Sequence, residues 1–432
     1  MSLTEYLVQQ RWFASKAREV AHCDILEQLE LGDGLRVAFI ETVFSPGTHE
    51  TYQLLLEGDG TRDVLAQRAG VLLELMRAEA DIEQGESIIR FRQLGEIAES
   101  GPAHPPRPVD AEQSNSSVVF GDELILKVFR RVEPGINPDL EISRFLTEHG
   151  FERIPGLLGW YEIEGRNLDA TLGMLQHFVA GARDGWALAL DELVSDPEAF
   201  LHRVGRLGEV VGQMHAVLGS DASDPAFAPE EPSTESLGLL TATIDEEIER
   251  IFLDLADREE ASEIAGRGEE VRDHLRMLTQ VAVGGRVIRH HGDLHLGQTL
   301  FSQDDWLVLD FEGEPARPLA ERRRKRSPLR DVAGMLRSFA YAASAAEMQR
   351  GAPAPEGWEQ RAREAFLEGY FRTVDAALLP PGQAAIKQLL AIFELEKAVY
   401  ELRYELNNRP DWVRIPVAGI LRLLDGPVEA AG

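Results

Sequence analysis

Three polar side chains, Asp293, Gln298 and Asp310, are spaced along the sequence in a pattern that suits phosphoryl transfer. Residues 289–298 read RHHGDLHLGQ, and the apolar run Trp306–Leu309 leads directly into Asp310. Two short strands holding a loop between them would bring these three side chains around one point. A carboxylate that orients a hydroxyl, together with an amide oxygen and a second carboxylate for a hard cation, supplies what phosphoryl transfer needs.

Two of the acidic side chains in this region, Asp293 and Glu312, also have an ordinary structural explanation. An aspartate in a polar turn commonly bonds its own backbone, which could account for Asp293. The pattern favours catalysis, because His-Gly-Asp is followed five residues later by Gln298 and then by a strand ending in Asp-Phe-Glu. Glu312, the last residue of that tripeptide, could hold a second metal ion or serve as a supporting or capping carboxylate.

Composition limits the partners that we expect. The 432 residues carry a formal charge of −30, which disfavours nucleic acid and anionic membranes and favours a cationic small substrate. The single Cys23 excludes an intrachain disulfide and suits a reducing compartment. We find neither a signal peptide nor an apolar run long enough to span a membrane, so we expect a cytoplasmic protein.

The elements that must position the site fall into three predicted parts. Residues 1–98 are expected to form an α+β unit, with helices over 3–13 and 71–79 and antiparallel strands over 35–43 and 51–57. A proline-rich stretch at 101–108 is predicted to be a linker.

Residues 109–180 are predicted to form a small lobe that begins with a β-hairpin over 116–129. Strand alternation places Lys127 on the same face as the apolar Ile125 and Phe129. A lysine on an apolar face needs an anionic partner, and we expect that partner to be Glu141 on the helix that follows. Alternatively, Lys127 is an ordinary strand lysine that reaches solvent along its aliphatic stem.

Residues 181–432 are predicted to be mostly helical. One helix is expected over 200–218, further helices over 238–280, and a last long helix over 388–407. His215 on the first of these is expected to be a bonded core histidine.

Several separated blocks resemble the maltokinase and glucosamine kinase group of actinobacterial sugar kinases, which has an aminoglycoside phosphotransferase-like fold. The blocks lie at residues 10–13, 113–117, 129–138, 291–298, 310–315, 327–338 and 408–412. The resemblance implies an α+β, bilobal, protein kinase-like fold with an N-terminal α/β cap subdomain and a mostly helical C-terminal lobe. For the cap, it leaves regulation and contact with a partner enzyme as candidate uses.

The resemblance also implies roles for individual residues and a need for ATP and Mg²⁺. Asp293 would be the catalytic base, and Gln298, Asp310 and Glu312 would bind metal. Lys127, held by Glu141, would bridge the α- and β-phosphates. The remaining nucleotide contacts would come from a small polar turn and a strand end, although an ordinary turn and a buried strand explain these equally well; they are Ser114, Asn115, Ser116, Ser117, Gln176, Phe178 and Val179.

The acceptor sugar is the least determined part of the prediction. We expect the sugar to contact Asp293 and His295, together with the polar face and end of the last long helix, namely Glu401, Tyr404, Glu405, Asn408, Asp411 and Trp412. Carboxylates accept sugar hydroxyls and an indole covers an apolar ring face, although a solvated acidic helix face has the same pattern. Two carboxylates would favour an ammonium group, so glucosamine, phosphorylated on its 6-hydroxyl, is preferred to maltose, phosphorylated at its anomeric hydroxyl.

Two further hypotheses belong to other classes of protein. A catalytically inactive kinase fold could serve as a binding module, but such a protein has no need for Lys127, Glu141, Asp293 and Asp310 together. The basic run Arg322–Arg326 could indicate nucleic-acid binding. In so acidic a chain we expect it instead to be a solvated loop near the phosphate site.

Overall fold

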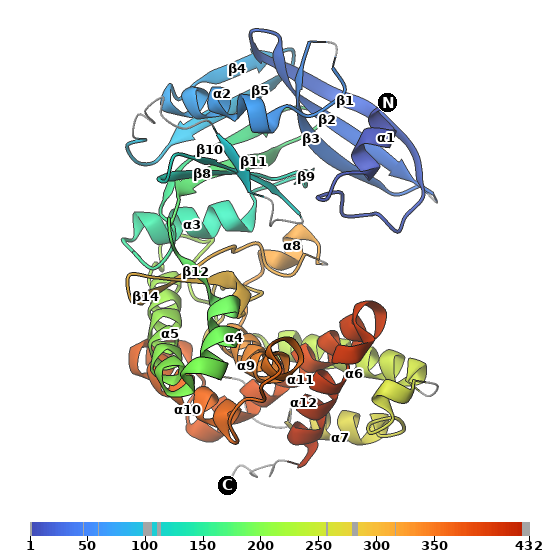
Figure 1. The fold of residues 1–432 in the computed structure, drawn as a ribbon, viewed down its shortest axis with the longest axis vertical. Coiled ribbons are helices and arrows are strands. Elements are labelled where there is room, and N and C mark those ends of the chain that lie inside the picture. Colours follow the sequence, from blue (N-terminus) through green and yellow to red (C-terminus); the bar gives the residue numbers. More distant parts are fainter. Residues whose placement is uncertain are drawn as a thin grey trace. The chain divides into compact units, whose positions relative to one another are not determined.

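The computed structural model describes residues 2–45, 47–58, 60–97, 106–109, 114–255, 258–278, 284–315 and 317–425, with only the backbone of Thr234. The chain forms two compact units, Met1–Gly181 and Ala182–Gly432 (Figure 1). Most of the expected linker at 101–108 lies outside the described residues, but its end belongs to β6 (Arg107–Val109), an edge strand that tolerates Pro108. The three-part division of the chain stays a prediction.

The first sheet of the N-terminal unit has the strand order β1-β2-β3-β9 and is antiparallel. Its strands are β1 (Val20–Gly32), β2 (Leu35–Phe44), β3 (His49–Glu57) and β9 (Arg131–Val132). Helix α1 (Leu3–Val8) is shorter than the predicted 3–13, and turns follow it as far as Trp12 and Phe13. These two aromatic side chains are buried against Tyr52 of the sheet, with ring centroids 5.9 and 5.1 Å away, so packing rather than helical periodicity sets their positions.

A second, larger sheet in the same unit has the order β4-β5-β10-β11-β8-β7-β6. The predicted hairpin is confirmed as β7 (Ser116–Phe120) and β8 (Leu124–Val128), joined by a turn with Gly121 at a positive φ of 59°. Helix α2 (Leu65–Arg77) packs on this sheet with buried leucines. The other elements are β4 (Asp81–Gln84), β5 (Ser87–Gln93), α3 (Pro138–Glu148), β10 (Leu157–Glu164) and β11 (Ala170–His177).

The C-terminal unit is mostly helical, as predicted, with one small sheet of β12 (Arg183–Asp184), β13 (Thr299–Ser302) and β14 (Asp305–Val308). Its long helices include α5 (Pro197–Leu218), α9 (Leu329–Arg350) and α11 (Gln383–Asn408), and the first and last lie where the sequence predicted helices. The others are α4 (Gly185–Ser195), α6 (Thr234–Asp254), α7 (Gly268–Leu278), α8 (Leu319–Arg322), α10 (Trp358–Thr373) and α12 (Arg414–Asp425).

Close helix packing holds this unit together. Helices α5 and α10 pack side by side, and their backbones approach so closely that a Cβ on Gly369 would lie 2.0 Å from the carbonyl oxygen of Gly205 (Figure 1). Helices α6, α7, α11 and α12 share an apolar core that includes Ile248, Leu275 and Leu402. None of the described helices combines the length and hydropathy needed to cross a membrane.

Candidate active site

The loop that carries Asp293 is fixed by one buried carboxylate at the start of α9. The backbone N–H groups of His291 and Gly292 donate to the two oxygens of Asp331, at 2.8 and 2.9 Å. Gly292 has a φ of 86°, which lets the chain turn at this point without the strain that a side chain would add. Asp331 therefore positions the two residues that precede Asp293, one through each of its oxygens.

Asp331 is itself held by His215 of α5. The Nε2 atom of His215 lies 3.0 Å from Oδ2 of Asp331, and its Nδ1 lies 3.0 Å from the hydroxyl of Tyr370. Burial opposes ionisation of Asp331, but the neighbouring His290 and His215 outweigh it and hold its pKa well below the usual range. His215 is fully buried and bonded on both nitrogens, so its expected role as a core histidine is confirmed.

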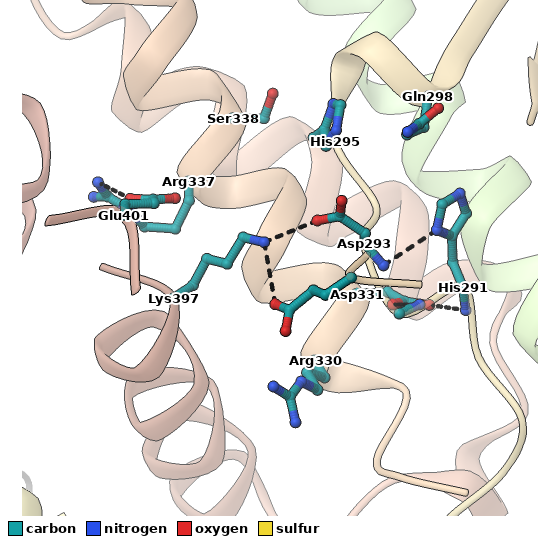
Figure 2. Close-up of polar contacts among 12 residues, drawn as sticks. His291, Asp293, His295, Gln298, Arg330, Asp331, Arg337, Ser338, Lys397 and Glu401 are labelled. Carbon is teal, nitrogen blue, oxygen red and sulfur yellow. Dashed lines mark hydrogen bonds and ion pairs between the residues drawn. The ribbon is translucent and has the colours of Figure 1, made fainter. Parts of the chain in front are cut away.

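The carboxylate of Asp293 lies beside an ammonium group from α11. Lys397 Nζ donates to Oδ1 of Asp293 at 2.9 Å and to Oε1 of Glu314 at 3.4 Å. Figure 2 shows Lys397 extending from its helix towards Asp293. The Arg337–Glu401 pair lies on the side of Lys397 that faces away from Asp293. Burial alone would raise the pKa of Asp293, but Lys397 and His295 outweigh it and lower that pKa to about 2. Asp293 is therefore ionised at neutral pH, as an acceptor of a hydroxyl proton must be.

Glu314 continues this arrangement as a chain of alternating charges. Arg317 pairs with Glu314 and, at 3.3 Å, with Glu396, which also accepts a hydrogen bond from Arg330 at 2.6 Å. The charged groups from Asp293 to Arg330 line a small cavity of about 20 Å³, which is room for about one water molecule. Nη1 of Arg330 is buried and finds no hydrogen-bond partner among the described residues, so one donor at this cavity is left for a ligand.

The three residues predicted to bind metal lie near one another. Gln298, at the end of the 3₁₀ turn Leu296–Gln298, donates from Nε2 to Oδ2 of Asp310 at 3.1 Å. Carboxylate oxygens of Asp310 and Glu312 lie within 4.8 Å of each other. Burial lowers the pKa of His295, while the charges of both Asp293 and Asp310 raise it, so this histidine is close to both carboxylates. With the side-chain amide of Gln298 rotated so that its oxygen faces Asp310, the side chains of Gln298, Asp310 and Glu312 present only oxygen atoms to a metal ion. Oxygen ligands suit Mg²⁺.

In the N-terminal unit, the lysine predicted to bind phosphates has a carboxylate partner that the sequence argument did not name. Nζ of Lys127 donates to Oδ2 of Asp139 at 2.8 Å, and both side chains are buried. Asp139 lies at the start of α3, whose N-cap Asn137 accepts from its backbone N–H, and the predicted partner Glu141 is buried on the same helix. The lysine does need an anion on its apolar face, as expected.

The other predicted nucleotide residues occupy a turn and a strand end of the same unit. Ser114 and Asn115 form the bend before β7, where Asn115 donates to the hydroxyl of Ser114 at 3.3 Å, and Ser117 is buried. The hydroxyl of Ser116 already accepts from Arg130 Nε at 2.7 Å.

At the strand end, Gln176 donates to the carbonyl of Pro155 at 3.2 Å. Phe178 N–H donates to the carbonyl of Glu123 at 2.7 Å, and Val179 follows directly. These contacts neither require nor exclude a nucleotide.

The carboxylates of α11 do not form the solvated acidic face that was the structural alternative. Three of them are buried and one, Glu396, is partly buried, and each is paired with arginine: Glu394 with Arg363, Glu396 with Arg330, Glu401 with Arg337, and Glu405 with Arg409. Burial raises the pKa of Glu401 against the attraction of Arg337, which is itself fully buried. Glu401 and Glu405 each already have a guanidinium partner, so their predicted role as ligands of an ammonium group stays a prediction.

The aromatic residues at the end of α11 form a stacked group. Trp412 lies 6.2 Å from Tyr341 with nearly parallel rings, and the guanidinium of Arg409 lies over both Trp412 and Tyr404. Tyr341 also donates to Glu405 at 3.2 Å.

The last two residues predicted to contact sugar lie at this exposed end. Asn408 donates to the carbonyl of Tyr404 at 2.8 Å, and Asp411 is exposed.

Sequence reasoning missed the residues that surround Asp293. The sequence argument assigns no role to Lys397, and it includes Glu314, Arg330 and Asp331 only as parts of matching blocks. A usable signal was present, since a lysine on a helix face rich in carboxylates needs a defined partner once that face is buried. The basic run Arg322–Arg326 is also less solvated than expected, because only one of its residues is exposed.

Comparison with known proteins identifies two parts of the chain. The profile of the phosphotransferase enzyme family matches residues 106–367, which is more than half of the chain, and the maltokinase N-terminal cap domain matches residues 6–72.

Two curated relatives are glucosamine kinases. That of Mycolicibacterium smegmatis is 29% identical over 338 residues, covering 75% of this chain and 80% of the relative. That of Streptacidiphilus jiangxiensis is 26% identical over 413 residues, covering 92% and 90%.

Among solved structures, a glucosamine kinase in complex with glucosamine, ADP and inorganic phosphate superposes with a TM-score of 0.74 at 21% identity, covering 98% of this chain and 99% of the other. A second crystal form of a glucosamine kinase gives a TM-score of 0.75 over 99% of this chain and 100% of the other. These likenesses confirm the predicted fold: a kinase-like arrangement with an N-terminal cap. Because the profile matches more than half of its length, including the loop at residues 289–298, the chain belongs to the phosphotransferase enzyme family.

Proposed function

We propose that this phosphotransferase is a sugar kinase that transfers the γ-phosphate of ATP, with Mg²⁺, to the 6-hydroxyl of glucosamine. The observation that carries the proposal is the ionised Asp293, which is fixed through its neighbours by Asp331 and shares His295 with Asp310 as an electrostatic neighbour. A carboxylate of this kind accepts a hydrogen bond from the acceptor hydroxyl and aligns its oxygen with the γ-phosphorus. Positioning and charge stabilisation then supply most of the rate.

The residues present suit the nucleotide and the metal. When bound, Mg²⁺ would supply positive charge that stabilises the negative charge developing on the phosphate oxygens. Gln298, Asp310 and Glu312 would hold it. Lys127 would contact the α- and β-phosphates from the N-terminal unit, and the polar turn at 114–117 and the strand end at 176–179 would provide the remaining contacts to ATP.

On the acceptor side, Lys397 and Arg330 complete the charge arrangement at Asp293. The ammonium of Lys397 lies 2.9 Å from the carboxylate, and Arg330 has a buried donor without a partner among the described residues. Both cations would stabilise the negative charge of an approaching phosphoryl group. His295 and the end of α11 would line the sugar site.

Glucosamine is supported by the relatives and by the overall charge. The curated relatives are glucosamine kinases, and a net charge of −30 attracts a cationic amino sugar. Maltose, phosphorylated at its anomeric hydroxyl, is the second candidate. The match to the maltokinase cap domain supports it, as does the pairing of Glu401 and Glu405 with arginines, because a neutral sugar needs no free carboxylate.

Steady-state kinetics with ATP would test the proposal. Magnesium-dependent ADP release is measured with glucosamine, maltose, glucose and N-acetylglucosamine, and each product is identified by mass and by the position of its phosphate. Turnover on maltose with none on glucosamine would replace the acceptor but keep the kinase. Absence of ADP release on a broad sugar panel, with the Asp293→Asn variant equal to the wild type, would favour an inactive binding module instead.

The location and the use of the cap belong to the same proposal. The single cysteine supports a cytoplasmic location. Contact with a partner enzyme through residues 6–72 is a further proposal, for which pull-down with the isolated partner would be the direct test.

A further inference from the structure

A second, larger cavity in the C-terminal unit is rich in arginine although the chain as a whole is strongly acidic. This cavity, of about 790 Å³, lies between α6 and the segment that joins α8 to α9. Six basic and three acidic side chains line it, so its charge is opposite in sign to that of the chain. Such a local excess of positive charge needs either counterions or a ligand.

All three acidic side chains of this basic cavity are already paired. Glu230 binds Lys325 at 2.5 Å, while Glu321 and Glu396 lie 3.6 and 3.3 Å from Arg317. Lys325 is satisfied further by two backbone carbonyls at 2.8 Å. The carboxylates therefore leave the arginines at positions 324 and 326 uncompensated.

Arg326 is the least compensated of these cations. Within the described part of the chain, no carboxylate lies within ion-pair distance of its guanidinium, and the same is true of Arg324. Burial and the charges of Arg330, Arg317 and Arg324 lower the pKa of Arg326 to about 10, against the attraction of Glu396. Leaving a partly buried guanidinium without an anion is unfavourable, and an arriving anion would remove that cost.

The opposite wall of the basic cavity has a different chemistry. Helix α6 contributes Leu239, which is 63% exposed, and Leu240, beside the hydroxyl of Ser236. A ligand with one strongly anionic end and a less polar body would satisfy both walls. Planar guanidinium groups bind phosphate in a two-point geometry, which makes phosphate the anion that fits best.

We propose that the basic cavity is a second ligand site, in which Arg324 and Arg326 bind the phosphate group of a small phosphate-bearing metabolite and the α6 wall contacts the remainder. The site is separate from the one at Asp293, although Arg317 and Glu396 lie on the walls of both cavities. The proposal concerns binding and does not depend on which sugar is the acceptor.

Isothermal titration of the full chain with inorganic phosphate and with glucose 6-phosphate would test this proposal. The titrations are made without Mg²⁺ or nucleotide and at constant ionic strength, with glucose as the neutral control. We expect saturable binding of at least one phosphate ligand and none of glucose. Tighter binding of glucose 6-phosphate would assign the site to a sugar phosphate, and equal or weaker binding would assign it to free phosphate.

Single substitutions test whether the phosphate ligand binds in the basic cavity. We expect Arg326→Gln to weaken binding by roughly tenfold or more, because a charge-assisted hydrogen bond is lost, and Arg324→Gln to weaken it less. Arg166→Gln is the matched control, since it removes one positive charge from a side chain that is 80% exposed in the other unit. Equal affinities in the wild type and Arg326→Gln, or no saturable binding of either phosphate ligand, would overturn the proposal.

Thermal unfolding separates a ligand role from a structural one. Without phosphate, Arg326→Gln should unfold at the same temperature as the wild type or higher, because an uncompensated cation is removed while the backbone pairing of residue 326 with Ile288 is kept. Added phosphate should raise the midpoint of the wild type more than that of the variant. A variant that unfolds much earlier than the wild type in phosphate-free buffer would show that Arg326 is structural and would refute the proposal.

Discussion

Replacing Lys397 by methionine should move the acid limb of the activity profile. In the wild-type protein, Lys397 and His295 lower the pKa of Asp293 from 3.8 to about 2 against the effect of burial. A shift of this size corresponds to roughly 2 to 3 kcal/mol in favour of the charged carboxylate. Without the ammonium, burial is opposed mainly by His295, and the nearby Glu314 adds repulsion, so the pKa of Asp293 should rise above 3.8.

The assay is kcat/KM from ADP release between about pH 4 and pH 8, which reports the ionisation of essential groups in the free enzyme. The wild type should show no inflection from Asp293 in this range. Lys397→Met should lose activity as the pH falls, through an inflection inside the range. Lys397→Arg, which keeps the charge, should retain the wild-type profile. An unchanged acid limb in Lys397→Met would refute the assignment of Lys397 as the group that keeps Asp293 ionised.

The same variant has a predicted effect on stability. Loss of Lys397 leaves the partly buried Asp293 and the buried Glu314 without their shared cation, and breaking a buried pair costs about 3 to 5 kcal/mol. Because the pKa of Asp293 is depressed, its contribution to wild-type stability is present above pH 3.8 and is lost as the pH falls towards 2. Urea unfolding at neutral pH would measure the loss, and kinetic data should be taken only where the variant is folded.

Three other predictions follow from the structure. Asp293→Asn should lower kcat by about 10²- to 10⁴-fold and should also lower the stability by roughly 2 to 3 kcal/mol because the ion pair with Lys397 is lost, and a folded variant with near wild-type turnover would exclude Asp293 as the base. Asp331→Ala should destabilise the fold by roughly 3 kcal/mol or more in urea unfolding, because two backbone N–H groups and His215 lose their buried acceptor; a loss below about 1 kcal/mol would contradict this. Gly369→Ala should cost about 1 to 3 kcal/mol because its Cβ would meet the backbone of Gly205, whereas Gly238→Ala, with open space around it, should be neutral or stabilising; equal effects would refute the packing argument.

The sequence predicts best what depends on short segments. The hairpin of β7 and β8 follows from alternation and a turn glycine, and the grouping of Gln298 with Asp310 follows from a loop between two short strands, 12 residues apart. The helix predicted over 3–13 is longer than α1 because Trp12 and Phe13 continue its apolar pattern. In the structure these two side chains instead pack in the core beside the sheet.

Pairings between distant segments could not be predicted. Lys397 is 104 residues from Asp293, and Arg337 is 64 residues from Glu401, so no local pattern links either pair. Nor could sequence predict that Asp139 pairs with Lys127, because the orientation of the helix that carries Asp139 depends on the sheet. A charged side chain that the local sequence pattern places on the surface can be buried when its ion-pair partner comes from a distant segment of the chain.

The buried arginine–glutamate pairs of α11 have a consequence for ionic strength. Dissolved salt screens charges that face water but reaches interior pairs poorly. A surface with a large excess of negative charge repels itself, and that repulsion weakens as salt is added. The ion pairs that hold α11 should therefore persist when salt is added, while repulsion between the negative charges on the surface decreases. We expect the free energy of unfolding to increase from dilute buffer to moderate sodium chloride.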